Sequence, residues 1–353
     1  FCAVSAAKPA SAVWSFLCFQ QSHVPWIGGS LHDLIQPGFS FLVGVALPFS
    51  LAARRAKGQN PGQMRVHAFK RAFILVILGI FLRSLGRGQT HFTFEDTLTQ
   101  IGLGYGFLYL LGLRPRRDQW IAFALILVVF WAAFAFYPPP PADFDWESVG
   151  VPADWPHLMS GFEAHWNKNE NFSAAFDRWF LNLFPREQPF VYNSGGYQTL
   201  SFIPTLATMI LGLLAGGILR SGLGDRERLR WLIVAGVTGL ASGWLIGAVG
   251  LCPVVKRIWT PSFTLWSGGW CFLFLAAFHY VVDIKGIQRW AFPLLVLGMN
   301  SIAAYCADWL WKGFIHDALL RHLGEGPFLI FGPAYEPLLV GAATLAILWY
   351  VLY

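Results

Sequence analysis

The feature that most constrains the fold is a succession of long apolar segments separated by short charged ones. Most of these segments approach the roughly 20 residues that an α-helix needs to cross the hydrocarbon core of a bilayer. Only 12% of the 353 residues are charged, whereas a soluble domain carries about 25%. The sequence therefore predicts an integral membrane protein with an all-α fold, a polytopic transmembrane helix bundle that forms one domain over residues 1–353.

The apolar segments predict about nine membrane spans. They cover residues 34–53, 72–86, 97–113, 119–137, 198–219, 231–251, 262–282, 290–311 and 336–353. Residues 1–33 are too short and too interrupted to form a span. The chain begins at Phe1 and stops at Tyr353 inside an apolar segment, so we expect a fragment that lacks a first helix.

Lys and Arg are concentrated in alternate loops, which predicts the orientation of the bundle. The basic loops are residues 54–71, 114–118, 220–230 and 283–289. The positive-inside rule places these loops in the cytoplasm, so the net charge of +6 needs no nucleic-acid partner. The opposite, extracytoplasmic side receives residues 1–33, 87–96, 138–197, 252–261 and 312–335.

The extracytoplasmic loop 138–197 is the only long loop, and it is rich in Trp. After four consecutive prolines it alternates aromatic and polar residues, which argues against disorder. We expect it to fold over the outer ends of the spans. Its aromatic faces suit sugar rings, and anchoring of Trp at the membrane interface is the alternative.

Polar groups gather where the first predicted span begins. His23, Trp26 and Asp33 surround the helix-breaking pair Gly28-Gly29. Imidazole titrates near neutral pH, so His23 suits a general base or an acyl carrier. Asp33 would orient that imidazole or, compatibly, cap the following helix with Gln36 as in a capping box. An interfacial histidine without a role is the alternative for His23.

The spacing of this region resembles the signature of a known family. The pattern is His23-x2-Trp26-x-Gly28-x4-Asp33-x3-Pro37-x-Phe39-x-Phe41-x2-Gly44. It is similar to the heparan-alpha-glucosaminide N-acetyltransferase family of polytopic membrane proteins, which includes bacterial relatives. In that family the histidine is held to be catalytic, so the resemblance implies a catalytic role for His23.

Later segments extend this resemblance along the chain. They are residues 171–179, Gly196 to Gly212, Lys256-x2-Trp259-Thr260-x-Ser262-Phe263 and Gly298-Met299-Asn300. Two segments depart from the family pattern. Asn193-Ser-Gly-Gly stands where the family has Asp-Pro-Glu-Gly, and Leu98-Thr-Gln-Ile stands where it has Leu-Gln-Arg-Ile.

Several further polar residues are candidates for binding. Arg83 would hold a phosphate, carbonyl or carboxylate, or snorkel to the interface. Lys256 and Trp259 would contact substrate, with Trp26. Asn300 is a site residue or a hydrogen-bonding link between helices. Glu95 and Asp96 are more simply explained by a helix start.

The resemblance implies transfer of an acetyl group from acetyl-CoA to an amino sugar or glycan, and the predicted topology places the donor in the cytoplasm and the acceptor on the opposite side. The donor's pantetheine arm would thread a polar passage that Arg83, Gln100 and Asn300 line, with Gln100 contacting the donor. The alternative is a non-catalytic transporter of a glycan or lipid intermediate. We expect membrane lipids as neighbours and a bacterial inner (plasma) membrane as the location. The sequence is compatible with a homodimer as well as with a monomer.

Cysteine usage adds little to the functional prediction. The five Cys residues show no metal-ligand spacing, so no metal is expected. Cys2 and Cys18 are free to form a disulfide, although nothing in the sequence requires one.

Overall fold

The computed structural model describes residues 1–353 and consists of helices and loops, with one isolated β-bridge between Ile27 and Val255. The chain forms two compact units. The first contains Phe1–His23, Ser30–His32 and Phe278–Tyr353, and the second contains Val24–Gly29 and Asp33–Ala277. Of the motif residues between His23 and Gly44, only His23 lies in the first unit.

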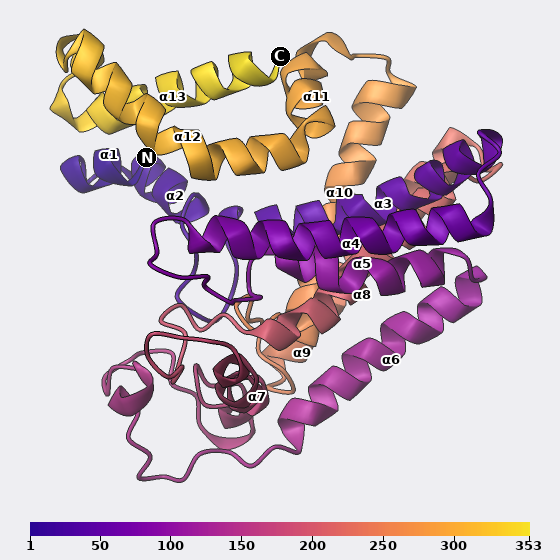
Figure 1. Cartoon of the computed structure of the whole chain (residues 1–353), viewed down its shortest axis with the longest axis horizontal. Helices are drawn as coiled ribbons and strands as arrows, with labels where there is room; N and C mark the ends of the chain where they lie inside the picture. Colours follow the sequence, from indigo (N-terminus) through magenta and orange to yellow (C-terminus); the bar gives the residue numbers. More distant parts are fainter. The chain divides into compact units, whose positions relative to one another are not determined.

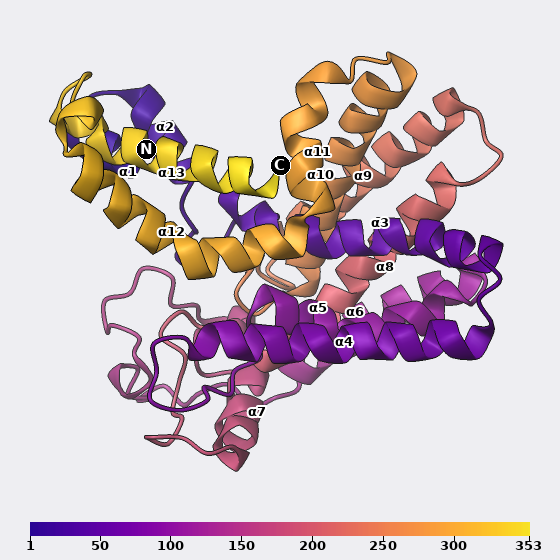
Figure 2. The same cartoon turned by 45° about the horizontal axis from the view of Figure 1, so that its top comes forward.

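The second unit is built from eight α-helices, α3 to α10, which Figures 1 and 2 label along the chain. They are α3 (Ile35–Ala56), α4 (Pro61–Ser84), α5 (Thr97–Gly112), α6 (Arg116–Ala135), α7 (Phe172–Phe180), α8 (Phe202–Leu219), α9 (Asp225–Ala248) and α10 (Pro261–Phe278). Short 3-10 turns occur at His32–Leu34, Glu147–Val149, Gly161–Trp166, Leu181–Leu183 and Thr199–Ser201.

Helices α3 and α8 pack against each other most closely, and glycines make that approach feasible. A Cβ atom on Gly44 would lie 1.9 Å from the Met209 carbonyl oxygen, and one on Gly212 would lie 1.9 Å from that of Phe41. Only hydrogen fits at such positions. The motif glycine Gly44 therefore serves helix packing, and α5 and α6 complete the bundle against α8.

The first unit contains α1 (Cys2–Ala7), α2 (Ala12–Gln20), α11 (Phe292–Met299), α12 (Ser301–Leu323) and α13 (Glu336–Leu352). A π-helical segment His279–Ile284 and 3-10 turns at Arg289–Ala291, Gly326–Phe328 and Pro333–Tyr335 connect them. Helices α12 and α13 pack together, and a disulfide joins Cys2 to Cys18.

The expectation of about nine spans is not confirmed, because six helices are long and apolar enough to cross a membrane. A seventh span results if α11 and α12 count as one, although a 72° bend at Asn300 separates them. The predicted spans 72–86 and 97–113 fall on α4 and α5. Helix α4 has a polar first half, and α5 has 16 residues, which reach only about 24 Å. The all-helical fold of an integral membrane protein is confirmed.

The long loop 138–197 is folded around aromatic side chains. Trp166 is fully buried, stacks parallel to Phe134 of α6 and belongs to one cluster with Trp26, Leu200 and Ile258. The indole N–H of Trp26 donates to the Trp166 carbonyl oxygen at 3.1 Å. Within the second unit, this loop therefore packs against and hydrogen-bonds to the motif segment around Trp26.

Candidate active site

The loop before α10 holds the motif segment in place. The Gly28 N–H donates to the Val254 carbonyl at 2.8 Å, next to the bridge between Ile27 and Val255. The Arg257 guanidinium donates to the carbonyl oxygens of Val24 at 3.3 Å and Gly195 at 2.5 Å. Two segments that the sequence resemblance treats as separate motifs thus form one structural element.

Asp33 and Lys256 form a buried ion pair. Lys256 Nζ lies 3.3 Å from Asp33 Oδ1, and the side chains are 6% and 1% exposed. Asp33 Oδ2 also accepts the Val24 N–H at 3.2 Å. Burial lowers the pKa of Lys256, and the neighbouring carboxylate opposes that shift. The Asp33 carboxylate thus fixes the main chain at Val24, one residue after His23, and compensates the positive charge of the buried Lys256.

The expectation that Asp33 caps the first long helix is wrong. Helix α3 begins at Ile35, and its N-cap position is occupied by Leu34, whose side chain cannot accept a hydrogen bond. Asp33 instead lies in the 3-10 turn His32–Leu34. Its carboxylate is directed to partners that are distant in sequence, which no local pattern could indicate.

His23 is exposed and belongs to the first unit. Its ring lies against that of His32, with a centroid distance of 4.4 Å and an angle of 55° between the ring planes. His32 is half-buried and falls outside the family pattern, so no sequence signal predicted that the two imidazoles lie together.

The two motif tryptophans are buried packing residues. Trp26 is fully buried, and Trp259 is 2% exposed with its indole N–H donating to Thr208 Oγ1 at 3.1 Å. Trp259 adopts a φ of +50°, which is uncommon for a bulky side chain and is held by the surrounding Thr260 network. Contact with substrate by these two residues remains a prediction.

Additional cations near the ion pair were missed by the sequence reasoning. The charge of Arg257 acts on both Lys256 and Lys168, and burial together with Arg257 lowers the pKa of Lys168. Lys168 and Arg257 lie over the rings of Trp155 and Tyr197, respectively. These positive groups surround the region that Asp33 anchors. The one hint to these cations in the sequence was the presence of Lys168 within the aromatic outer loop.

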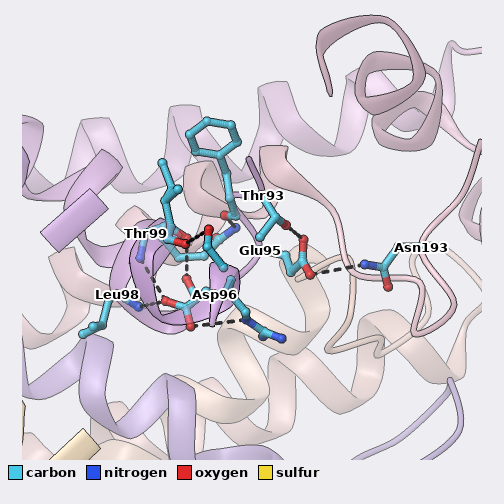
Figure 3. A network of polar contacts seen from close by, with 11 residues as sticks. Thr93, Glu95, Asp96, Leu98, Thr99 and Asn193 are labelled. Carbon is cyan, nitrogen blue, oxygen red and sulfur yellow. Dashed lines mark hydrogen bonds and ion pairs between the residues drawn. The ribbon is translucent and has the colours of Figure 1, made fainter. Parts of the chain in front are cut away.

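A polar network surrounds the start of α5 (Figure 3). The Asp96 carboxylate accepts the N–H groups of Leu98 and Thr99 and caps α5. This agrees with the prediction that Glu95 and Asp96 lie at a helix start. Arg83 at the end of α4 lies 3.6 Å from Asp96. The structure therefore gives Arg83 an intramolecular partner at the end of its helix.

Gln100 is buried in the same network and links three segments. Its amide nitrogen donates to the carbonyl oxygens of Phe94 at 2.8 Å and Thr199 at 3.3 Å, and its amide oxygen accepts from Thr205 Oγ1 at 3.4 Å. These bonds fix α5 against the start of α8. Contact between Gln100 and a donor molecule remains a prediction.

Asn193, at the first departure from the family pattern, organises its own turn. Its side-chain oxygen accepts the N–H groups of Gly195 and Tyr197 at 2.9 and 3.2 Å. Its side-chain nitrogen donates to Glu95 Oε1 at 3.3 Å, and Thr93 donates to the same carboxylate (Figure 3). The Asn193 side-chain amide thus closes this turn. The aspartate of the family pattern could close it in the same way, because a carboxylate accepts the same two hydrogen bonds.

Asn300 lies at the bend between α11 and α12 in the first unit. Its amide nitrogen donates to the carbonyl oxygens of Val296 and Leu352, both at 3.1 Å. These contacts match the alternative in which Asn300 links helices. Its place in a passage with Arg83 and Gln100, which belong to the second unit, remains a prediction.

Asp177 in α7 is a buried carboxyl group within the segment 171–179 that resembles the family, and the sequence assigned it no role. Its Oδ2 accepts the Thr199 N–H at 2.9 Å, whereas its Oδ1 has no hydrogen-bond partner. Burial raises the pKa of Asp177 to about 7, and the bonds from Thr199 oppose the shift. The folded protein therefore carries this group largely protonated below neutral pH.

We expect Asp177→Asn to stabilise the protein at pH 8 but not at pH 4. The folded-state pKa of about 7 exceeds the ordinary value of 3.8, so the free energy of unfolding falls as pH rises through that window. Asparagine removes a penalty of up to about 4 kcal/mol and keeps an oxygen for Thr199. Thermal unfolding in detergent across this pH range measures the difference. If the stability difference between Asp177→Asn and wild type were the same at pH 4 and pH 8, the assignment of the raised pKa to Asp177 would be wrong.

Comparison with known proteins supplies the wider context for this arrangement. No protein-family model matches the chain. The human heparan-alpha-glucosaminide N-acetyltransferase is 22% identical over 336 residues, which cover 83% of this chain and 49% of the human protein. The mouse protein of the same name is 21% identical over 321 residues, with 80% and 48% covered. The chain spans about half the length of these curated relatives. Along about four fifths of its length, it resembles the heparan-alpha-glucosaminide N-acetyltransferases, as its motifs indicate.

Proposed function

We propose that this chain carries the acetyl-transfer site of a membrane acetyltransferase. The donor is acetyl-CoA on the cytoplasmic side, and the acceptor is the amine of an amino sugar or glycan on the other side of a bacterial inner (plasma) membrane. The observation that carries the proposal is the sequence similarity to two acetyltransferases over most of the chain, together with the spaced His23 to Gly44 motif.

In the proposed reaction the acceptor amine attacks the thioester carbonyl. The new C–N bond forms first and gives a tetrahedral intermediate, while the His23 imidazole takes the amine proton. The C–S bond then breaks, and the imidazole passes its proton to the leaving thiolate. In the alternative covalent route, the His23 imidazole attacks the thioester and expels CoA as the thiolate. The amine then attacks the acetyl-imidazole, the C–N bond to the ring breaks, and the released imidazole takes the amine proton. Asp33 supports either route by fixing the main chain next to His23.

The cation-rich surroundings of Asp33 support acyl transfer in a second way. A tetrahedral intermediate carries a negative oxygen, and fixed positive groups stabilise such charge more effectively in a site that excludes water. Lys256, Lys168 and Arg257 supply three positive charges in one region of the second unit, and the Asp33 carboxylate supplies one negative charge there. We propose that this excess of positive charge serves the reaction.

The function is tested with purified protein in liposomes. We expect labelled acetyl-CoA on the face of the basic loops, with glucosamine on the opposite face, to yield N-acetylglucosamine where the sugar was added. Adding both substrates to the opposite face should yield none. Absence of labelled product in every arrangement, or uptake of unmodified sugar without acetylation, would contradict the proposal, and uptake would instead support a transporter.

Sidedness is tested by cysteine labelling. Trp166 is fully buried, so a cysteine there would be a poor probe, whereas Leu183 in the long loop is 63% exposed. In a Cys306→Ser background, we expect Leu183→Cys to react only with a reagent outside the cell and Arg116→Cys only with one inside. The opposite pattern would reverse the proposed topology.

A further inference from the structure

A polar pocket lies in the second unit, and none of its lining residues contributes to the ion pair of Asp33 and Lys256. It has a volume of about 190 Å³ and is formed by the segment after α4 and the end of the long loop. Its lining residues are Arg87, Gln89, Thr90, His91, Pro185, Arg186, Glu187 and Gln188. None of these residues has a role in the proposed acetyl transfer.

Arg186 is a preorganised cation in the wall of this pocket. Its Nε donates to the Leu181 carbonyl at 2.7 Å, and its Nη2 donates to the Phe92 carbonyl. These bonds fix the plane of the guanidinium without neutralising its charge. Burial lowers the pKa of Arg186, and the carboxyl groups of Glu95 and Asp177 oppose that shift. An anion in the pocket would stabilise this partly desolvated charge further.

His91 shows that the potential in the pocket is positive. Burial lowers the pKa of His91, and the charges of Arg87, Arg186 and Arg83 lower it further, whereas Glu187 alone raises it. The imidazole is therefore a neutral hydrogen-bonding group at neutral pH. A bound anion would reverse part of this electrostatic effect and raise the pKa of His91.

Glu187 is the opposing charge within the pocket. Its Oε1 lies 3.4 Å from the position that a Cβ atom on Gly88 would occupy, so the carboxylate approaches the opposite wall. With His91 neutral, the lining carries two guanidinium groups and one carboxylate. The remaining positive charge, with the polar side chains of Gln89 and Thr90, matches an oxyanion.

We propose that this pocket binds an oxyanion, a phosphate-type or sulfate-type group, between the guanidinium groups of Arg87 and Arg186. The pocket volume equals that of about six water molecules, so the pocket is large enough to hold such a group. The anion is either free in solution or attached to a sugar. This proposal does not depend on acetyl transfer, because none of its residues takes part in that reaction.

The test follows the His91 pKa by nuclear magnetic resonance of the full protein labelled at histidine. Inorganic sulfate is the probe, because its charge is constant across the titration, and chloride at equal ionic strength is the reference. We expect sulfate to raise the His91 pKa in a saturable manner while leaving the His157 resonance in place. Glucose 6-phosphate, with glucose as its neutral control, shows whether a sugar-borne anion binds more tightly than a free one.

Two substitutions with opposite expected effects on sulfate affinity distinguish a change in binding from a loss of folding. Arg87 is exposed, so Arg87→Gln should leave the loop folded and weaken sulfate binding by about tenfold or more. Glu187→Gln should strengthen binding, because it removes the competing carboxylate. Arg186 is avoided because it bonds to two main-chain carbonyls. A His91 pKa that ignores sulfate, or equal binding in wild type and Arg87→Gln, would overturn the proposal.

Discussion

His23→Ala is expected to lower the rate of acetyl transfer by about 10²–10⁴-fold, because the reaction loses its proton acceptor or its acyl carrier. His23 is exposed and lies outside the hydrophobic core, so the loss should not arise from unfolding. Binding of acetyl-CoA should remain, since the substitution removes only an imidazole. Initial rates of transfer, together with donor affinity measured by calorimetry, provide the comparison.

His32→Ala is the matched control for this substitution. Its ring packs against that of His23 at 4.4 Å but stands outside the family motif. We expect this variant to retain activity within about tenfold of wild type, which corresponds to about 1.4 kcal/mol in the barrier. Near-normal turnover in His23→Ala, or equal losses in both variants, would remove His23 from its proposed role.

The parts of the fold that could be predicted from sequence are those governed by local pattern. Apolar length identified most of the membrane helices, and Asp96 was correctly placed at a helix start. Helix α5 shows the limit of that reasoning. Its residues are apolar because α4 and α8 cover them, so hydrophobicity alone could not distinguish a short buried helix from a membrane span.

The candidate site required information that sequence spacing does not contain. Lys256 and Asp33 were both recognised as candidates, yet their pairing joins residues more than two hundred positions apart. A local rule assigned Asp33 to a helix cap, and tertiary contact overrode it. Asp177 was named only as part of the family-like segment 171–179 and received no role, because its displaced pKa arises from burial by neighbouring segments.

The motif glycines illustrate how a functional signature also encodes packing. Gly44 belongs to the same spaced pattern as His23, but its position against Met209 leaves no room for any side chain. Trp26 likewise fills the core of the outer loop. Much of the signature therefore maintains the scaffold that holds the motif segment, and the polar positions His23 and Asp33 are left as the stronger candidates for chemistry.

Lys256→Met is expected to lower the free energy of unfolding by about 3–5 kcal/mol, the typical cost of breaking a buried ion pair from one side. Methionine preserves most of the side-chain length, so the main change is a buried Asp33 carboxylate without its cation. Lys312→Met is the control, because Lys312 pairs with Asp308 at 3.1 Å with both side chains half exposed. That exposed pair should contribute about 0–1 kcal/mol. Thermal or denaturant unfolding in detergent measures both.

The double variant Asp33→Asn with Lys256→Met shows whether the effect belongs to the ion pair. Asparagine keeps an oxygen for the Val24 N–H but carries no charge, so the buried site no longer needs a cation. We expect the double variant to be more stable than Lys256→Met alone, because uncompensated charge rather than lost packing causes most of the destabilisation. Strictly additive losses would mean that Lys256 acts through its aliphatic chain. In that case Asp33 would be held by the main chain of Val24. The motif segment would then be linked to the loop before α10 by the Gly28 N–H bond to the Val254 carbonyl and by the Arg257 guanidinium bond to the Val24 carbonyl.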